Sequence, residues 1–144
     1  RIGYLIVSPE MKQWREMANA VTVANRICGY INAPSLLQKA VARCLDEKCD
    51  IAFYDNNRKL LWGGLTELGF ECVKPEGTFY LFVNSPEPDE HNFVARAKAH
   101  NLILVVGSTF AMPGYVRIAY CVSPDMIRRS MPHFEALAKE YALR

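Results

Sequence analysis

The chain has 144 residues, of which 51 % are hydrophobic and 22 % are charged, and this is typical of a globular chain that buries a core. The net charge is only +2, with acids and bases interspersed, which excludes a strongly basic nucleic-acid surface. No apolar run approaches the roughly 20 residues that span a bilayer, and the first residues lack the zones of a signal peptide. We expect a cytoplasmic location, with neither nucleic acid nor membrane as a partner.

The five cysteines are odd in number and irregularly spaced, which predicts free, buried thiols rather than disulfides. Cys44 and Cys49 are the only close pair. No histidine lies at a zinc-ligand spacing from them, so we expect no metal site. Because the chain begins without Met and directly in a strand-like run, we expect it to be a fragment of a longer protein.

The first third of the chain predicts one strand and two helices. Residues 2–7 form a β-branched and aromatic run that is typical of a buried strand. Ser8 and Pro9 then supply an N-cap and a first-turn proline for an amphipathic helix that reaches about Ile31. A second helix is expected after Pro34.

The rest of the chain predicts a small sheet covered by helices. A third helix should begin at Asp50 and end at Gly69, which suits a left-handed C-cap. Within it, Gly63 and Gly64 would permit close packing or a bend. A closing helix should start at Ser123 and Pro124 and be kinked or split at Pro132. A further helix is expected from about residue 90, and strands at residues 71–74, 78–83, 102–106 and 115–120.

The stretch VVGSTFAMPGYVRIAYC places one cation, Arg117, inside an apolar alternating run that follows a glycine-containing loop. The two-residue period of a strand puts Tyr115 and Ala119 on the Arg117 face, and Val116 and Tyr120 on the other. A guanidinium cannot lose its charge, so its burial costs several kcal/mol unless acceptors meet it. The partner is either a structural carboxylate of this chain or a ligand carboxylate held by the planar fork.

Five short motifs, taken in order, resemble the C-terminal part of class I and II aminotransferases. That family depends on pyridoxal 5'-phosphate and has the fold type I architecture of aspartate aminotransferase. The resemblance covers essentially the whole chain, and the opening RIGY is similar to the signature that follows the family's Schiff-base lysine. The motifs are RIGY, NAPS, LLWGGLTELGF, PEGTFYLF and VGSTFAMPGYVRIAY.

This resemblance implies an α/β fold. Residues 1–49 would be the C-terminal end of the large cofactor-binding domain, a strand plus two helices. Residues 50–144 would be the small α+β domain, a mixed sheet with helices on one face. The resemblance also implies that Arg117 binds the substrate α-carboxylate, that Arg1 contacts the cofactor phosphate, and that the parent is a homodimer acting on an amino acid and a 2-oxo acid.

None of the lysines in the chain lies in the serine-lysine setting that the family uses before the RIGY signature. No catalytic residue is therefore assigned, and we expect the fragment alone neither to hold the cofactor covalently nor to transaminate. Three alternatives stay open: a fold type I lyase of the carbon-sulfur type, an effector-sensing domain of a transcription regulator, and an interaction module. The last would leave Arg117 without an anion. The sequence does not determine which amino acid or 2-oxo acid would be used.

Overall fold

The computed structural model describes residues 2–143, and its contacts divide the chain into two units, Arg1–Cys49 and Asp50–Arg144. The boundary lies at the start of the third helix. The assignment of the two units to a large and a small domain stays a prediction.

The first unit holds two helices, α1 (Trp14–Ile27) and α2 (Ser35–Arg43). The predicted strand at residues 2–7 is wrong, because this segment has no strand to pair with among the described residues. None of the side chains in residues 2–49 is buried. Both helices are therefore amphipathic elements without a core of their own.

The first helix is shorter than predicted at both ends. Ser8 does not cap it, because the Ser8 hydroxyl accepts a hydrogen bond from the Glu10 amide in a local turn. The helix begins at Trp14 instead, and it ends at Ile27, where Gly29 follows with a φ of +84°. A left-handed glycine ends a helix readily, which explains why the apolar pattern up to Ile31 is not helical.

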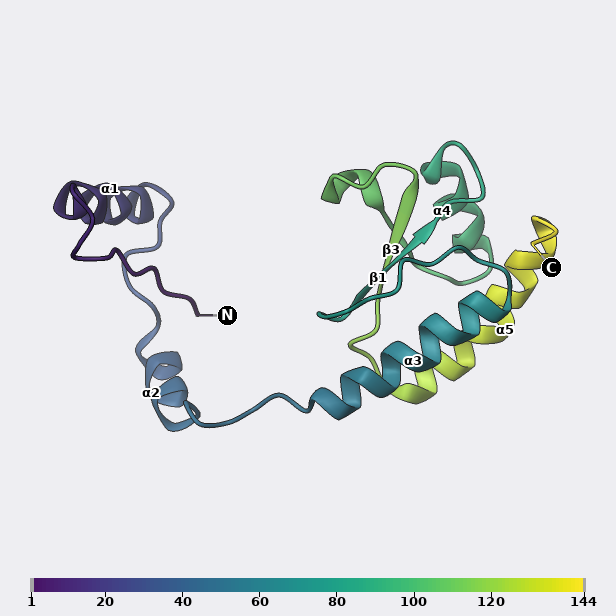
Figure 1. Ribbon diagram of the computed structural model, residues 1–144, viewed down its shortest axis with the longest axis horizontal. Coiled ribbons are helices and arrows are strands. Elements are labelled where there is room, and N and C mark those ends of the chain that lie inside the picture. Colours follow the sequence, from purple (N-terminus) through teal and green to yellow (C-terminus); the bar gives the residue numbers. More distant parts are fainter. Residues whose placement is uncertain (1, 144) are drawn as a thin grey trace. The chain divides into compact units, whose positions relative to one another are not determined.

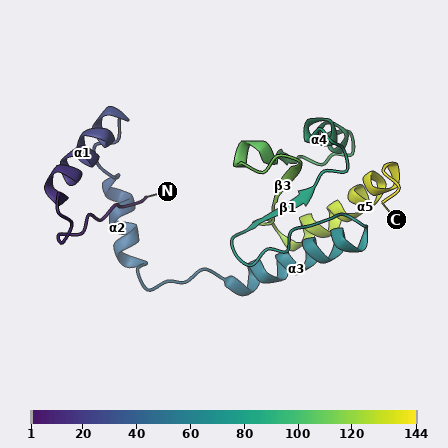
Figure 2. The same ribbon diagram turned by 45° about the horizontal axis from the view of Figure 1, so that its top comes forward.

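The second unit is a three-stranded antiparallel sheet covered by helices, and the predicted α/β fold class is confirmed. The sheet order is β1-β3-β2. In Figures 1 and 2, α3 and α5 lie side by side and run in the same direction. The elements are α3 (Ile51–Glu67), β1 (Tyr80–Asn84), α4 (Glu90–Ala99), β2 (Val105–Val106), the 3-10 helix η1 (Gly107–Phe110), β3 (Tyr115–Ala119) and α5 (Pro124–Glu140).

The helix ends of this unit follow the predicted signals. The Asp50 carboxylate accepts from the Phe53 amide at 2.9 Å and caps α3, and Gly69 follows that helix with a φ of +90°. The Ser123 hydroxyl caps α5 in the same manner, and the helix continues through Pro132 without a split. No helix within residues 2–143 is both long and apolar enough to cross a membrane.

The strands are shorter than predicted. Residues 71–74 contribute only an isolated bridge between Cys72 and Val83, so a full strand there is wrong. Of residues 102–106, only the last two form β2. The Leu102 amide instead donates to the Ala97 carbonyl at the end of α4, because the chain leaves the helix by a tight turn before it becomes extended.

The core lies between the sheet and its helices. Side chains from both the helices and the strands are buried there, including Leu65 of α3, Leu81 of β1, Val116 of β3 and Leu137 of α5. Gly64 lets α3 approach α5 closely, because a Cβ on it would lie 2.6 Å from the Met131 sulfur. Close packing at this glycine is thereby confirmed.

One buried polar side chain connects the helical layer to the sheet. Asn57 of α3 is fully buried, and its amide donates to the Tyr120 carbonyl at 3.0 Å and to the Val122 carbonyl at 2.7 Å. Both carbonyls follow the last residue of β3, where no strand partner reaches them. Asn57 therefore fixes the end of the strand that carries Arg117.

The cysteines are free, but the prediction that they are buried is wrong for four of the five, which are exposed. Three of these four, Cys28, Cys44 and Cys49, lie in the unit without buried side chains. Cys72 is the partly buried exception, and burial raises its pKa from 9.0 to about 11.

This difference predicts selective alkylation. At pH 8, Cys72 should react with iodoacetamide about 100-fold more slowly than a thiol with a pKa of 9, because only the thiolate attacks and each pKa unit is a factor of ten. The rate at each cysteine can be followed by peptide mass spectrometry. Equal rates in the folded chain would contradict the prediction, and equal rates in urea are the control.

Candidate functional site

Strand β3 puts Arg117 on the sheet face that the helices do not cover. Val116 and Tyr120 point into the core and are 0 % and 1 % exposed, so the side chain of Arg117 projects the other way. Its partners in the register are Phe82 of β1 and Val105 of β2. The predicted alternation of faces along this strand is therefore confirmed.

The guanidinium of Arg117 lies between two aromatic rings. Its central carbon is 4.1 Å from the ring centroid of Tyr80 and 3.6 Å from that of Phe110. Stacking of this kind stabilises a cation by about 0.5 to 2 kcal/mol per ring. The N–H donors point outward in the guanidinium plane, and contact with aromatic rings does not use them as a carboxylate would.

No carboxylate of residues 2–143 forms an ion pair with Arg117. The structural-carboxylate alternative therefore finds no support in the described part of the chain. The aromatic partners of this cation were not predicted from the sequence. The sequence signal for Tyr80 was its place in the predicted strand at residues 78–83, but its pairing with Ala119, which puts it on the Arg117 face, is known only from the fold.

The loop between β2 and β3 carries Phe110, and its shape depends on a glycine. Gly107 is buried, and a Cβ on it would lie 2.2 Å from the Met112 carbonyl oxygen and 2.5 Å from the Tyr115 carbonyl oxygen. The Met112 amide also donates to the Gly107 carbonyl at 3.0 Å. The loop thus folds back on its own first residue, and only glycine fits there.

A buried carboxylate holds this loop from outside. Glu90, the first residue of α4, is 6 % exposed. It accepts one hydrogen bond from the Ser108 amide at 2.9 Å and another from the Gly114 amide. These bonds, first that of Gly114 and then those of Ser108, hold the pKa of Glu90 below its usual range. Sequence reasoning identified residue 90 only as a helix start.

A row of aromatic rings leads from the first turn of α3 to the start of β1 beside Arg117. Phe53 and Tyr54 meet edge to face at 5.5 Å, Tyr54 lies 6.2 Å from Phe79, and Phe79 lies 4.5 Å from Tyr80. The cation therefore has apolar neighbours on this side, although Phe53 and Phe79 are themselves each 37 % exposed.

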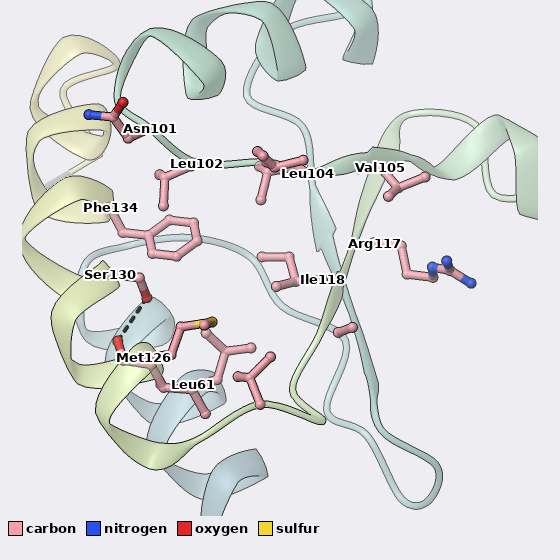
Figure 3. A pocket seen from close by; sticks show the side chains of 14 residues that line it. Leu61, Asn101, Leu102, Leu104, Val105, Arg117, Ile118, Met126, Ser130 and Phe134 are labelled. Atoms are coloured by element: carbon pink, nitrogen blue, oxygen red, sulfur yellow. Dashed lines mark hydrogen bonds between the residues drawn. The ribbon is translucent and has the colours of Figure 1, made fainter.

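An apolar cavity of about 370 Å³ lies beside β3, between the 101–105 segment and α5. Figure 3 shows that Arg117 extends away from the wall formed by Phe134 and Ser130. The cavity therefore borders the strand but does not contain the guanidinium, and its other lining residues carry no charge. We place the candidate site at the ring-flanked guanidinium and not in this cavity.

A sequence model of the family described as aminotransferase class I and II matches residues 1–134. The chain belongs to this family. It is 30 % identical over 138 residues to the aspartate/prephenate aminotransferase of Thermus thermophilus, with 93 % of this chain and 36 % of that protein covered. It is 34 % identical over 99 residues to aromatic-amino-acid aminotransferase 2 of Thermococcus litoralis, with 62 % of this chain and 24 % of that protein covered.

A solved aminotransferase structure from Eubacterium rectale is also similar, with a TM-score of 0.87 and 45 % sequence identity. The match covers 98 % of this chain and 35 % of that protein. The chain thus spans about a third of the length of the relatives that it matches over most of its own length.

Membership of this family implies pyridoxal phosphate as a cofactor, and we tested whether the residues present would fit it. They do not fit it by themselves. No lysine lines the cavity beside β3, and the lysines with defined contacts lie elsewhere: Lys59 on Asp55, Lys139 on Glu135 and Lys74 over Trp62. Arg1, the predicted phosphate contact, lies outside the described residues.

Proposed function

We propose that this chain supplies the carboxylate clamp of a pyridoxal-phosphate-dependent aminotransferase that moves an amino group between an L-amino acid and a 2-oxo acid. One observation carries the proposal: the Arg117 guanidinium is flanked by two rings and has no carboxylate partner in residues 2–143. Both substrates carry a carboxylate beside the reacting carbon. The names of the relatives, which are aspartate, aspartate/prephenate and aromatic-amino-acid aminotransferases, support this substrate class.

Arg117 would bind the carboxylate through two parallel N–H···O bonds in the guanidinium plane. Tyr80 and Phe110 lie against the guanidinium, whereas the two-point contact with a carboxylate is made at the edge of its plane. An edge-on, two-point contact sets the direction of the bond from the carboxylate to the α-carbon. Fixing that direction lowers the barrier to a reaction at the α-carbon.

The cofactor site itself would lie in residues outside this chain, because the described residues do not fit it. We propose that the chain is the C-terminal part of a longer, homodimeric, cytoplasmic enzyme, with residues 1–49 ending its large domain and residues 50–144 forming its small domain. The chain covers 36 % of the Thermus thermophilus relative and 35 % of the Eubacterium rectale structure, which supports its being part of a longer enzyme.

The chain alone should therefore carry no covalent cofactor. After incubation with pyridoxal phosphate and reduction with borohydride, we expect only sparse labelling scattered over several lysines, since none of them has a partner set that would favour an imine. Intact-mass spectrometry and peptide mapping measure this. Stoichiometric labelling of a single lysine would contradict the prediction.

Activity is tested in a protein that joins this chain to the N-terminal two thirds of its relatives. Such a protein should transfer amino groups between a panel of amino acids and 2-oxo acids, as measured by formation of the product 2-oxo acid. The same assay on the 144-residue chain alone should show no turnover above the free cofactor. Lyase products without amino-group transfer would overturn the proposal.

A further inference from the structure

We infer that Glu90 is a positioning residue: its buried carboxylate fixes the 107–114 loop so that Phe110 stays stacked on the guanidinium of Arg117. The importance of this role for catalysis rests on the proposed function. The geometric part of the inference does not, because it concerns contacts within residues 2–143 alone.

Glu90 is not needed as the cap of α4. An acidic residue in the first turn commonly serves as a cap or favours the helix dipole. Here the cap is Asp89, whose carboxylate accepts from the His91 amide at 2.9 Å. Both carboxylate oxygens of Glu90 are directed instead to the loop, one to the Ser108 amide and one to the Gly114 amide.

The two amides that Glu90 binds are far from it in the sequence. Ser108 and Gly114 are 18 and 24 residues away from Glu90 in sequence, and they lie near opposite ends of the loop. Phe110 lies between them. A single rigid anion that binds both ends limits how far the segment between them can move, and charge-assisted bonds to a buried carboxylate are stronger than neutral ones.

The other hydrogen bonds of the loop do not attach it to the helical layer. The Ala111 amide donates to Ser108 and the Met112 amide to Gly107 within the turn, the Thr109 hydroxyl donates to the Val106 carbonyl, and the Ser85 amide donates to the Gly114 carbonyl. The Phe110 ring is 42 % exposed, so core packing alone does not hold it. Glu90 is thus the buried polar contact that ties this turn to α4.

The test uses the 144-residue chain and the NMR signals of the Arg117 side chain, which the stacked rings shift upfield. Phe110→Ala should remove the contribution of that ring. Glu90→Gln keeps the size of the side chain but leaves one loop amide without its acceptor, and we expect it to lose most of the same upfield displacement. The double variant should add little to either single one.

Glu135→Gln is the matched control, because Glu135 is also an ionised glutamate but pairs with Lys139 at 2.8 Å on the surface of α5. It should leave the Arg117 signals unchanged. Methyl signals of Val116 and Leu137 report whether the core stays folded, so a general loss of structure is recognised separately. A further variant, Glu90→Asp, keeps the negative charge but shortens the side chain. We expect it to lose the upfield displacement of the Arg117 signals as Glu90→Gln does, because the shorter carboxylate does not reach both amides.

An unchanged Arg117 signal in Glu90→Gln would overturn the inference, as would a Phe110→Ala variant that does not shift it. Titration with acetate then separates this inference from the proposed function. Failure of acetate to perturb the wild-type Arg117 signals would count against the carboxylate clamp, while the variants would still decide the positioning role of Glu90. Several-fold weaker acetate binding in Glu90→Gln would support both the positioning role of Glu90 and the carboxylate clamp at Arg117.

Discussion

Replacement of Arg117 by Ala should lower kcat/KM of the protein joined to its N-terminal two thirds by on the order of 10²- to 10⁴-fold. The variant loses two charge-assisted hydrogen bonds to the substrate carboxylate, each contributing about 1.5 to 3 kcal/mol. Arg117→Lys keeps the charge but not the planar fork, so its loss should be smaller and still at least about tenfold. Steady-state kinetics with a fixed amino acid and varied 2-oxo acid measure both.

Arg128→Ala is the control for removal of an arginine. Arg128 pairs with Asp125 at 3.1 Å on the exposed surface of α5, where ion pairs contribute little. Its kcat/KM should stay within about twofold of the parent value. An Arg117→Ala variant that behaves like Arg128→Ala would show that the carboxylate is bound elsewhere.

Gly107→Ala should destabilise the second unit by about 3 kcal/mol, which lowers its thermal midpoint by roughly 10 to 20 °C. The new methyl group would lie 2.2 Å from the Met112 carbonyl oxygen and 2.5 Å from the Tyr115 carbonyl oxygen. Both atoms belong to the backbone, so they cannot move aside without unfolding the loop or displacing β3. Thermal unfolding followed by circular dichroism measures the change.

Two glycines of α3 serve as matched controls. A Cβ on Gly63 would have nothing within 4 Å, so Gly63→Ala should stabilise the helix by about 0.5 to 1 kcal/mol. Gly64→Ala meets only the flexible end of Met131, and we expect an effect between those of the other two. If Gly107→Ala and Gly63→Ala changed the free energy of unfolding in the same direction, the close approach at Gly107 would be contradicted.

Local signals predicted the elements whose boundaries are fixed locally. Asp50, Gly69 and Ser123 act on the helix that each of them borders, and the structure uses them as the sequence predicted. Ser8 is the exception among the local signals, because its hydroxyl accepts from the Glu10 amide in a local turn and α1 begins only at Trp14. The wrong strand predictions occur where a partner decides the outcome. Residues 2–7 have the composition of a strand, but a strand forms only when another segment meets its amides and carbonyls.

The candidate site was predictable in its central residue and not in its surroundings. Arg117 stood out because a fixed charge interrupts an alternating apolar strand, and its orientation followed from the period. Phe110 and Glu90 reach it through a folded loop and through hydrogen bonds across 18 and 24 residues. The spacing of apolar residues in the sequence does not predict contacts of that kind, so only the three-dimensional fold reveals them.

The aromatic stacking on Arg117 also changes the entropy of binding. A free arginine side chain loses about 1.5 to 2 kcal/mol of rotamer freedom when it is immobilised. Here Tyr80 and Phe110 already restrict it before any carboxylate arrives. An anion would therefore meet a side chain whose freedom was given up during folding, and more of the interaction energy would remain as affinity.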